Sequence, residues 1–313
     1  MNPKVVVFKK FINKNFPLDF NIPNWHFIDF DDPERETADA YFQININKYK
    51  NSTADEYDFI EKSKKPKIVF ESNIFRKGTE QFYLNHLVTE NLDKKYHRLG
   101  FDHFLRQGKF NNHNSPPDRW NHIKKLQGLE VKDWRTSGKH ILLVLQKAGD
   151  STLNKMYEDY GTYYNWIENT INEIRKHTDR PIILRPHKLR AKVPLAPFLS
   201  EDNKVYLSTS FDNRSRYEGG KSLEEDFKDA WAVVGYNSNS LVESTLEGIP
   251  TFPLSDESVV WDISNKNKLE KIENPFVNID RTQWCYDAGY MLWNYEEINN
   301  GVAWEHLKGV YFK

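Results

Sequence analysis

Three polar loops each follow an apolar run in the second half of the chain. Residues 146–151 (QKAGDS) follow ILLVL, residues 185–188 (RPHK) follow PIIL, and residues 236–240 (YNSNS) follow AVVG. In a parallel sheet, the carboxyl ends of the strands meet at one edge, and ligands bind beyond that edge. We therefore expect these three loops to form a single binding site.

The first loop offers one cation, a flexible backbone and a hydroxyl. Lys147, the backbone of Gly149 and Ser151 could together contact an anion or a sugar. The alternative interpretation is a plain strand-to-helix turn, in which Asp150 or Ser151 caps the helix that follows.

The second loop is cationic. Arg185, His187 and Lys188, with Arg190 behind them, follow a buried strand, and such a cluster suits a phosphate or diphosphate. The imidazole could donate to a phosphate oxygen or protonate a leaving group. The alternative is a solvated basic loop, since runs of charge usually face water.

The third loop opens a helix, and free amides at a helix start attract anions. Ser238 and Ser240 could hydrogen-bond a phosphate there, and Glu243, one turn later, could accept from ribose hydroxyls. The spacing of Ser240 and Glu243 is also that of a capping box, so the same residues have a structural interpretation.

Alternating strands and helices are predicted to hold these loops. Short apolar runs separated by polar helical segments are typical of an α/β fold with a doubly wound, mostly parallel sheet. Two such halves in 313 residues predict two Rossmann-like domains facing a cleft. The predicted strands are 4–8, 25–30, 39–44, 67–71, 141–145, 181–184, 204–207, 232–235 and 251–254. The predicted helices are 54–63, 163–177, 222–231 and 241–247.

We expect three parts along the chain: one Rossmann-like domain over residues 1–137, a second over 138–282 and a helical tail over 283–313. Residues 100–120 are predicted to form a long loop, because they are rich in turn formers. Trp284, Trp293 and Trp304 in the tail are expected to be packing residues rather than ligand contacts.

Composition excludes several classes of protein. A net charge of −1 excludes a globally basic nucleic-acid binder but leaves room for a local basic groove. The single cysteine, Cys285, excludes a disulfide framework and a cysteine-rich zinc site. No apolar run is long enough for a signal peptide or a membrane span, so we expect a soluble, cytoplasmic protein, in the host cytoplasm if a phage encodes it.

Other sequence patterns fail as functional motifs. The GGKS at residues 219–222 is no P-loop, because Ser215 stands where the first glycine belongs, and G-x-S-x-G is absent. The acidic triplet at residues 29–31 is predicted to be a solvated turn rather than a metal site. Four histidines without metal-ligand spacing are expected at the surface, namely His97, His103, His113 and His122.

The three loops with their flanks, VLQKAGDSTL, ILRPHK and VVGYNSNSLVESTLEGIPTF, resemble nucleotide-sugar glycosyltransferases of the GT-B type. The similarity is to the capsule-polysaccharide (Kdo-transferase-like) branch. Lys188 departs from that pattern, since proline usually follows the histidine. The resemblance implies that the 1–137 domain binds the acceptor, that the 138–282 domain binds the nucleotide sugar, and that the C-terminal helix crosses back to pack on the first domain. It also implies Arg185, His187, Ser238 and Ser240 on the donor phosphates and Glu243 on the ribose.

The resemblance implies a nucleotide diphosphate sugar, with UDP as its nucleotide, as co-substrate, and neither a tightly bound cofactor nor a metal. The donor-binding residues expected from the loops and the resemblance together are Gln146, Lys147, Gly149, Asp150, Ser151, Arg185, Lys188, Asn237, Ser238, Asn239, Ser240 and Glu243, with His187 as a catalytic residue.

Two further stretches of the chain resemble glycosyltransferases. VFESNIFRKG is similar to a carboxylate-and-arginine turn in the first half of the same branch, and SPPDRWNHIKK and WEHLKGVYFK look similar to phage enzymes that glycosylate hydroxymethylated pyrimidines in DNA. This second resemblance implies double-stranded DNA as acceptor, with lysines and arginines around residues 98–119 on its phosphates.

The acceptor side is assigned as follows. Arg76, Arg119 and Trp120 are expected to contact the acceptor, and Glu71 and Asp118 are candidates for the base that deprotonates its hydroxyl. For both carboxylates a structural role in a turn is an equal alternative.

The sequence thus predicts a glycosyltransferase acting on hydroxymethylated pyrimidine in DNA. Three alternatives remain open at this point: a glycosyltransferase for a surface or capsular polysaccharide, a non-catalytic nucleotide-sugar-binding module, and an epimerase or phosphotransferase on the same fold.

Overall fold

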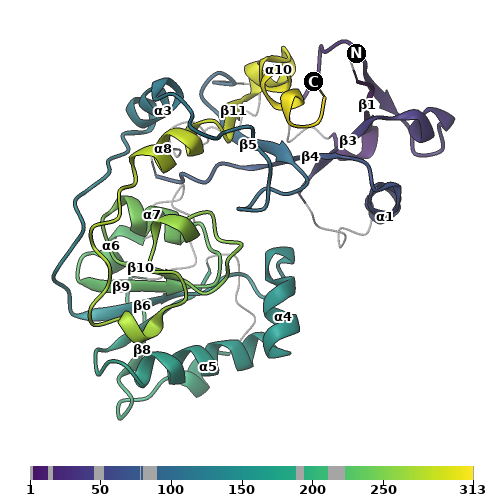
Figure 1. The fold of residues 1–313 in the computed structure, drawn as a ribbon. Coiled ribbons are helices and arrows are strands. Elements are labelled where there is room, and N and C mark those ends of the chain that lie inside the picture. Colours follow the sequence, from purple (N-terminus) through teal and green to yellow (C-terminus); the bar gives the residue numbers. More distant parts are fainter. Residues whose placement is uncertain are drawn as a thin grey trace. The chain divides into compact units, whose positions relative to one another are not determined.

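A computed structural model describes residues 3–12, 17–45, 53–77, 79, 90–187, 194–210 and 223–312. The chain divides into two compact units. Unit 1 comprises Met1–Gly128 and Thr282–Lys313, and unit 2 comprises Leu129–Arg281, so unit 2 is inserted into the sequence of unit 1. Both are mixed α/β units, as Figure 1 shows, and this confirms the predicted fold class.

Unit 1 is built on a six-stranded sheet with the order β11-β5-β4-β3-β1-β2. The first four strands of the chain pair in parallel, and β5 and β11 pair antiparallel at the far side. The parallel strands therefore follow the order 2-1-3-4, which reverses between β1 and β3. The strands are β1 (Val5–Phe8), β2 (Trp25–Ile28), β3 (Ala40–Ile44), β4 (Lys67–Ser72), β5 (Tyr96–Phe101) and β11 (Leu292–Asn294).

Aromatic side chains fill the core of unit 1, and several come from the tail. Trp304 and Trp293 are both buried, and the ring of Trp304 meets that of Trp25 edge-on at 5.5 Å. The tail tryptophans at these two positions are thus packing residues. The helices of unit 1 are α1 (Ala54–Ser63), α3 (Asp118–Gln127), α8 (Thr282–Gly289), α9 (Tyr295–Asn299) and α10 (Val302–Leu307), with 3-10 turns at Lys9–Phe11, Pro33–Thr37 and Lys308–Val310.

Unit 2 is built on a five-stranded, fully parallel sheet with the order β10-β9-β6-β7-β8. Counted within the unit, this is the 5-4-1-2-3 arrangement of a Rossmann sheet. The sheet reverses between β6 and β9, which are neighbours. The strands are β6 (His140–Val144), β7 (Ile182–Arg185), β8 (Val205–Leu207), β9 (Ala230–Gly235) and β10 (Thr251–Pro253).

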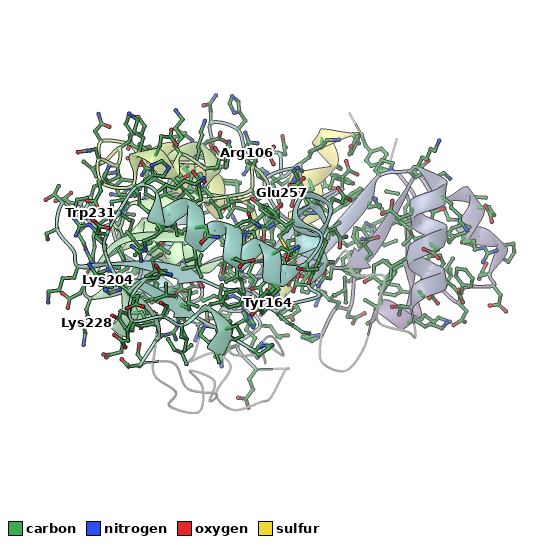
Figure 2. The ribbon with its side chains drawn as sticks, turned by 90° about the horizontal axis from the view of Figure 1, so that it is seen from below. Arg106, Tyr164, Lys204, Lys228, Trp231 and Glu257 are labelled. Atoms are coloured by element: carbon green, nitrogen blue, oxygen red, sulfur yellow. The ribbon has the colours of Figure 1, made fainter. Side chains whose placement is uncertain are left out.

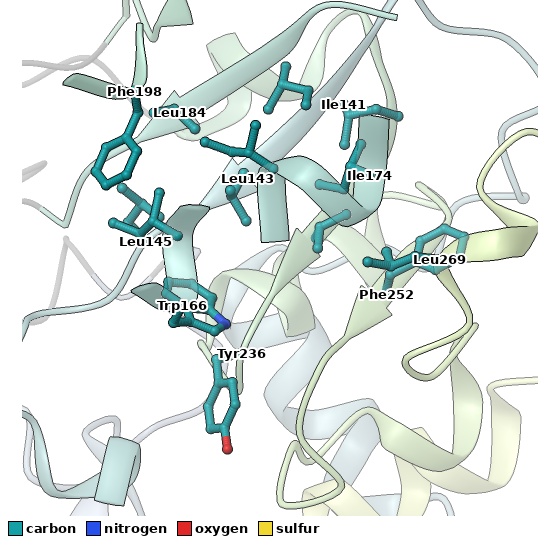
Figure 3. Packing of buried hydrophobic residues seen from close by; sticks show 14 of the residues in the cluster. Ile141, Leu143, Leu145, Trp166, Ile174, Leu184, Phe198, Tyr236, Phe252 and Leu269 are labelled. Atoms are coloured by element: carbon teal, nitrogen blue, oxygen red, sulfur yellow. The ribbon is translucent and has the colours of Figure 1, made fainter. Parts of the chain in front are cut away.

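Helices cover both faces of this sheet, α5 on one and α6 and α7 on the other (Figure 1). On α5, Trp166, Ile167 and Ile174 are fully buried and pack on Ile141 and Leu143 of β6 (Figure 3). Burying each such side chain contributes about 1.5–3 kcal/mol. The helices are α4 (Asn154–Tyr160), α5 (Tyr163–Arg175), α6 (Leu223–Phe227) and α7 (Ser240–Leu246), with 3-10 turns at Ser151–Leu153, Ala196–Phe198, Trp261–Ile263 and Leu269–Lys271.

The structure differs from the predicted elements in three places. The segment predicted as a loop contains the end of β5 and the start of α3, and the helix predicted over 222–231 ends at Phe227, so that Trp231 lies in β9. The tail is not wholly helical, since β11 pairs with β5. The strands β5, β9 and β11 in these places each pair with a strand that is distant in the sequence, and a local sequence pattern does not show such pairing.

One expectation about the histidines is wrong. His97 lies in β5 and is buried, with its ring stacked on Phe70 at 4.6 Å. His103 is half-buried and accepts from the Leu105 N–H, whereas His113 and His122 are exposed, as predicted. No group of three potential metal ligands occurs in the described ranges, and no helix among them is long and apolar enough to cross a bilayer.

Candidate functional site

The loops after β6 and β9 meet where the order of the unit 2 sheet reverses. Gln146 follows β6, and Asn237 follows β9. The Gln146 Nε2 donates to Asn237 Oδ1 at 2.8 Å, and the Asn237 backbone N–H donates to Gln146 Oε1 at 3.0 Å. Both side chains are less than 10% exposed, so this pair fixes the two loops against each other beneath the sheet edge.

Further polar contacts extend from this pair. Asn237 Nδ2 donates to the backbone carbonyl of Thr152 at 2.8 Å and reaches Glu257 Oε2 at 3.3 Å. The hydroxyl of Tyr163 on α5 both accepts from the Gln146 N–H and donates to its carbonyl, each at 2.8 Å. Burial raises the pKa of Tyr163, which keeps this hydroxyl protonated. Loops after three strands are therefore joined at one place.

Some residues of the 146–151 loop make internal contacts, and others are exposed. Asp150 caps the short helix that follows, accepting from the Thr152 N–H at 3.0 Å, and Ser151 is buried. Gly149 has the left-handed φ of +79° that favours glycine, and its N–H donates to the Tyr157 hydroxyl at 2.8 Å. Lys147 is exposed and remains the group of this loop that can meet a ligand.

The 236–240 loop presents backbone donors. Ser240 is the first residue of α7, and its N–H donates to Ser238 Oγ at 3.2 Å. Asn239, not Ser240, occupies the N-cap, so the Ser240 and Glu243 capping box does not form. In the part of the chain described, the N–H groups of Ser238 and Asn239 donate to no protein acceptor. Glu243 is buried in α7.

Arg185 has a different environment from the predicted one. Its Nη1 pairs with the buried carboxylate of Asp226 on α6, which also accepts from the hydroxyls of Ser208, at 2.8 Å, and Ser210. The guanidinium charge is thus matched by a protein carboxylate in a structural ion pair. This environment argues against the interpretation of Arg185 as part of a solvated basic loop. It also argues against the interpretation of Arg185 as an unpaired cation that binds a phosphate.

His187 lies two residues beyond β7 and is half-buried. Lys188, Arg190 and the 219–222 segment lie outside the described residues.

Glu257 was not anticipated from the sequence. It follows β10 on the same edge of the sheet, with its N–H donating to Ser255 Oγ at 3.2 Å. Figure 2 places it well apart from Lys204 and Lys228, which flank the amino ends of β8 and β9. Applying the strand-end rule to β10 as well would have found it. Other residues that sequence reasoning missed are Thr152, Tyr157, Tyr163 and Asp226.

In unit 1, the two carboxylates predicted as candidates for the base have different environments. Glu71 lies near the end of β4, and its Oε1 accepts from both the N–H and the hydroxyl of Ser72, at 2.7 and 2.8 Å. Arg76 Nη2 in turn donates to Ser72 Oγ at 2.7 Å. Asp118, at the start of α3, is exposed and accepts from the Tyr290 hydroxyl at 3.0 Å.

Two predicted acceptor contacts are internal. Arg119 makes a two-bond ion pair with Glu297, at 2.7 and 2.9 Å, and its guanidinium lies 3.9 Å from the centre of the Trp293 ring. Trp120 is only 4% exposed and packs on Phe75. Arg119 therefore holds α3 against the tail and Trp120 holds it against the turn after β4, which argues against the predicted contact with an acceptor.

The order of the unit 2 sheet together with the mixed sheet of unit 1 invites comparison with known folds. The fold resembles that of KpsC. A solved structure described as Thermosulfurimonas dismutans KpsC, beta Kdo 2,4 transferase, superposes with a TM-score of 0.55 over 92% of this chain and 90% of its own, at 14% identity. A second, described as the beta Kdo 2,7 transferase of the same KpsC, gives a TM-score of 0.48 at 12% identity, covering 98% of this chain and 99% of its own.

No family model and no curated protein matches the sequence. The likeness therefore concerns the fold, which is that of a two-domain GT-B-like protein.

Proposed function

We propose that this chain is a glycosyltransferase whose donor, a nucleotide-activated sugar, binds beyond the carboxyl edge of the unit 2 sheet. The observation that carries the proposal is the Gln146 and Asn237 pair at the reversal between β6 and β9. In open α/β sheets, ligands bind at this crevice. The similarity in fold to a Kdo transferase supports the class of reaction.

The donor phosphates are proposed to bind a side-chain cation and backbone N–H groups at this edge of the sheet. Lys147 is exposed, and the N–H groups of Ser238 and Asn239 lack protein acceptors among the described residues. These groups would stabilise the charge that grows on the leaving phosphate as the bond to the sugar breaks. His187 is placed after β7 and is assigned the proton transfer to that leaving group.

The acceptor is proposed to be a hydroxyl of a saccharide, as in a surface or capsular glycan. The acceptor oxygen attacks the anomeric carbon, the bond from that carbon to the phosphate oxygen breaks, and a carboxylate of unit 1 takes the hydroxyl proton. Glu71 and Asp118 are the candidates for this base.

A DNA acceptor is not favoured by the environment of the residues that suggested it. Arg98 is only 2% exposed, Arg119 is ion-paired with Glu297, Lys109 is exposed but ion-paired with Asp102, and Trp120 is buried. Of the arginines and lysines at residues 98–119, this leaves Arg106 as an exposed cation. Duplex DNA requires exposed cations on its phosphates and an aromatic surface for an extruded base.

The first test is donor consumption. The full chain is titrated with UDP-, GDP-, ADP- and CMP-sugars, and donor loss is measured alone, with oligosaccharides and with duplex DNA containing hydroxymethylcytosine. We expect one nucleotide to bind, its sugar to move to an oligosaccharide, and Asn237→Ala to weaken donor binding at least tenfold.

Asn172→Ala, which changes an exposed asparagine on α5, serves as the matched control and should bind donor as the unaltered chain does. Binding without consumption would favour a non-catalytic module, a gain in DNA mass would restore the DNA acceptor, and no binding by any donor would refute the proposal.

A further inference from the structure

The carbonyl groups at the end of α7 are bonded by residues from outside that helix. The last carbonyls of an α-helix have no acceptor role within its own ladder, so donors from elsewhere usually reach them. Here the Thr245 carbonyl accepts from Arg281 Nη1 at 2.6 Å, and the Leu246 carbonyl accepts from the Lys132 N–H at 2.8 Å. The carboxyl end of α7 is therefore held by residues that lie far from it in the sequence.

These residues lie next to the two places where the chain passes between the units. The first passage falls between Gly128 and Leu129, and the second falls between Arg281 and Thr282. Lys132 follows the first passage by three residues, and Arg281 directly precedes the second. Arg281 Nη2 also donates to the Lys132 carbonyl at 2.6 Å. Arg281 thus joins the two connections to each other and to α7.

The guanidinium of Arg281 is held in place by its surroundings. The residue is 8% exposed, and its guanidinium carbon lies 4.1 Å from the centre of the Trp134 ring. The Trp134 Nε1 in turn donates to the Ile279 carbonyl at 2.8 Å, which fixes the orientation of the ring. A cation over an indole face adds attraction to the two hydrogen bonds. The position of Arg281 is therefore well defined.

The first connection lies directly against the residue that follows the end of α7. Gly248 has a left-handed φ of +72°, and a Cβ at this position would lie 2.0 Å from the Asp133 carbonyl oxygen. The Gly248 carbonyl accepts from the Arg135 N–H at 2.6 Å. This contact leaves no room for the connection to shift while the end of α7 stays where it is.

The amino end of the same helix has the groups assigned to the donor phosphates, namely the N–H groups of Ser238 and Asn239. The helix has only seven residues, and a helix this short is not stable by itself in water. Its conformation depends on the core packing of Leu241 and Val242 and on the bonds at its two ends. Loosening the carboxyl end should therefore disturb the direction of the N–H groups at the amino end.

We propose that Arg281 is a positioning residue for the donor, because it holds the helix whose amino end binds the phosphates. Local opening breaks the bonds from Arg281 and Lys132 to α7, and the nucleotide favours the closed state, in which the N–H groups are oriented. By linkage, the nucleotide stabilises the closed connections as much as these favour the nucleotide. This inference rests on the proposed function, because it concerns the donor of that reaction.

A second arginine of unit 2 provides a matched control. Arg180 also lies over a tryptophan, 4.3 Å from the centre of the Trp231 ring, and also donates to a backbone carbonyl, that of Gly138, at 2.7 Å. It precedes β7 and so lies at the amino edge of the sheet, opposite the donor loops. A merely structural role would make the two arginines alike in their effect on the donor.

The first part of the test is nucleotide affinity. UDP, GDP, ADP and CMP are titrated by calorimetry into the full chain, Arg281→Ala and Arg180→Ala. We expect the nucleotide that binds to be held about tenfold or more weakly by Arg281→Ala, and with unchanged affinity by Arg180→Ala. Arg281→Lys should recover part of the loss, since it keeps the charge with fewer donors. Thermal unfolding of each variant confirms that folded proteins are compared.

The second part is amide hydrogen exchange, which does not depend on activity. The nucleotide should slow exchange of the Lys132 N–H by about threefold or more in the unaltered chain, and not in Arg281→Ala. The internal control is the turn before β8, where the N–H groups of Ser200 and Val205 each donate to the other's carbonyl, at 3.0 and 2.8 Å. Equal slowing there would indicate general stabilisation by the ligand instead.

Several results would overturn the proposal: normal nucleotide affinity in Arg281→Ala, an equal loss in Arg180→Ala, or exchange of the Lys132 N–H that the nucleotide does not slow. Each of these would reject the role of Arg281 and leave the donor site in place. Binding of no nucleotide to the unaltered chain would refute the proposed function and this inference with it. If Arg281→Ala does not fold, Arg281→Lys and the exchange of the unaltered chain decide the matter.

Discussion

Gln146 and Asn237 exchange two hydrogen bonds, of 2.8 and 3.0 Å, across the point where the unit 2 sheet reverses its order. The bonds run from a side-chain amide to a side-chain carbonyl and from a backbone N–H to a side-chain carbonyl. The ends of β6 and β9 are therefore held in register by groups that do not depend on pH. A site fixed in this way is organised before its ligand arrives.

Removing one member of this pair should cost both stability and donor affinity. Gln146→Ala leaves the buried Asn237 Oδ1 and N–H without their partners, and such a loss costs about 1–3 kcal/mol. Urea unfolding measures the change. The double variant Gln146→Ala/Asn237→Ala should be less damaging than the sum of the two single variants; strict additivity would show that the pair is not coupled.

The pair of Arg185 with Asp226 should behave as a structural ion pair. Asp226→Ala leaves the half-buried guanidinium of Arg185 without its carboxylate, and we expect a loss of about 3–5 kcal/mol in the free energy of unfolding. Asp229→Ala, which breaks an exposed pair with Lys139, is the control and should change it by less than about 1 kcal/mol. A similar small effect for both variants would contradict the structural role.

Trp120 is expected to contribute to the core and not to an acceptor surface. Trp120→Ala should lower the free energy of unfolding by about 3–5 kcal/mol, because it leaves a cavity beside Phe75. Phe276→Ala removes a ring that is 46% exposed and should cost less than about 1.5 kcal/mol. A Trp120→Ala protein of normal stability that loses only acceptor binding would support the original prediction instead.

His97 should give the fold a measurable dependence on acid. Its pKa is about 3 in the folded protein against an ordinary value of 6.5, so the unfolded chain binds the proton first. As the pH falls from about 6.5 to about 3, this residue should therefore reduce stability by about 1.4 kcal/mol per pH unit. Urea unfolding at several pH values should give a slope that is steeper in the unaltered chain than in His97→Phe by about this amount; equal slopes would contradict the prediction.

The fold of unit 2 could be predicted closely because its strands are parallel and buried. Apolar runs such as 141–145 alternate with amphipathic helices, and this local pattern is enough to predict the elements. In unit 1, β5 was not predicted from the sequence. Its sequence, YHRLGF, contains a histidine and an arginine, which are usually exposed but are buried here. Its place depends on pairing with β4 and with β11, and no local pattern reports such distant partners.

The same limit applies to the site. The strand-end rule located the edge where Gln146 and Asn237 meet, since that rule depends only on the direction of the strands. It did not reveal that Asp226, 41 residues from Arg185, would match the charge of that arginine. The sequence shows where a charged side chain lies along the chain. It does not show which opposite charge the folded helices bring next to it.

The insertion of unit 2 into unit 1 has a consequence for biosynthesis. Asn294 of β11 donates to the carbonyl of Asp93, 201 residues earlier in the chain. At about 5–20 residues per second, a ribosome needs roughly 10–40 s to make the residues in between. Throughout that interval the outer edge of β5 lacks the strand that later pairs with it, and an unpaired edge invites association with other chains. Unit 1 thus completes its sheet only after the whole of unit 2 has been synthesised.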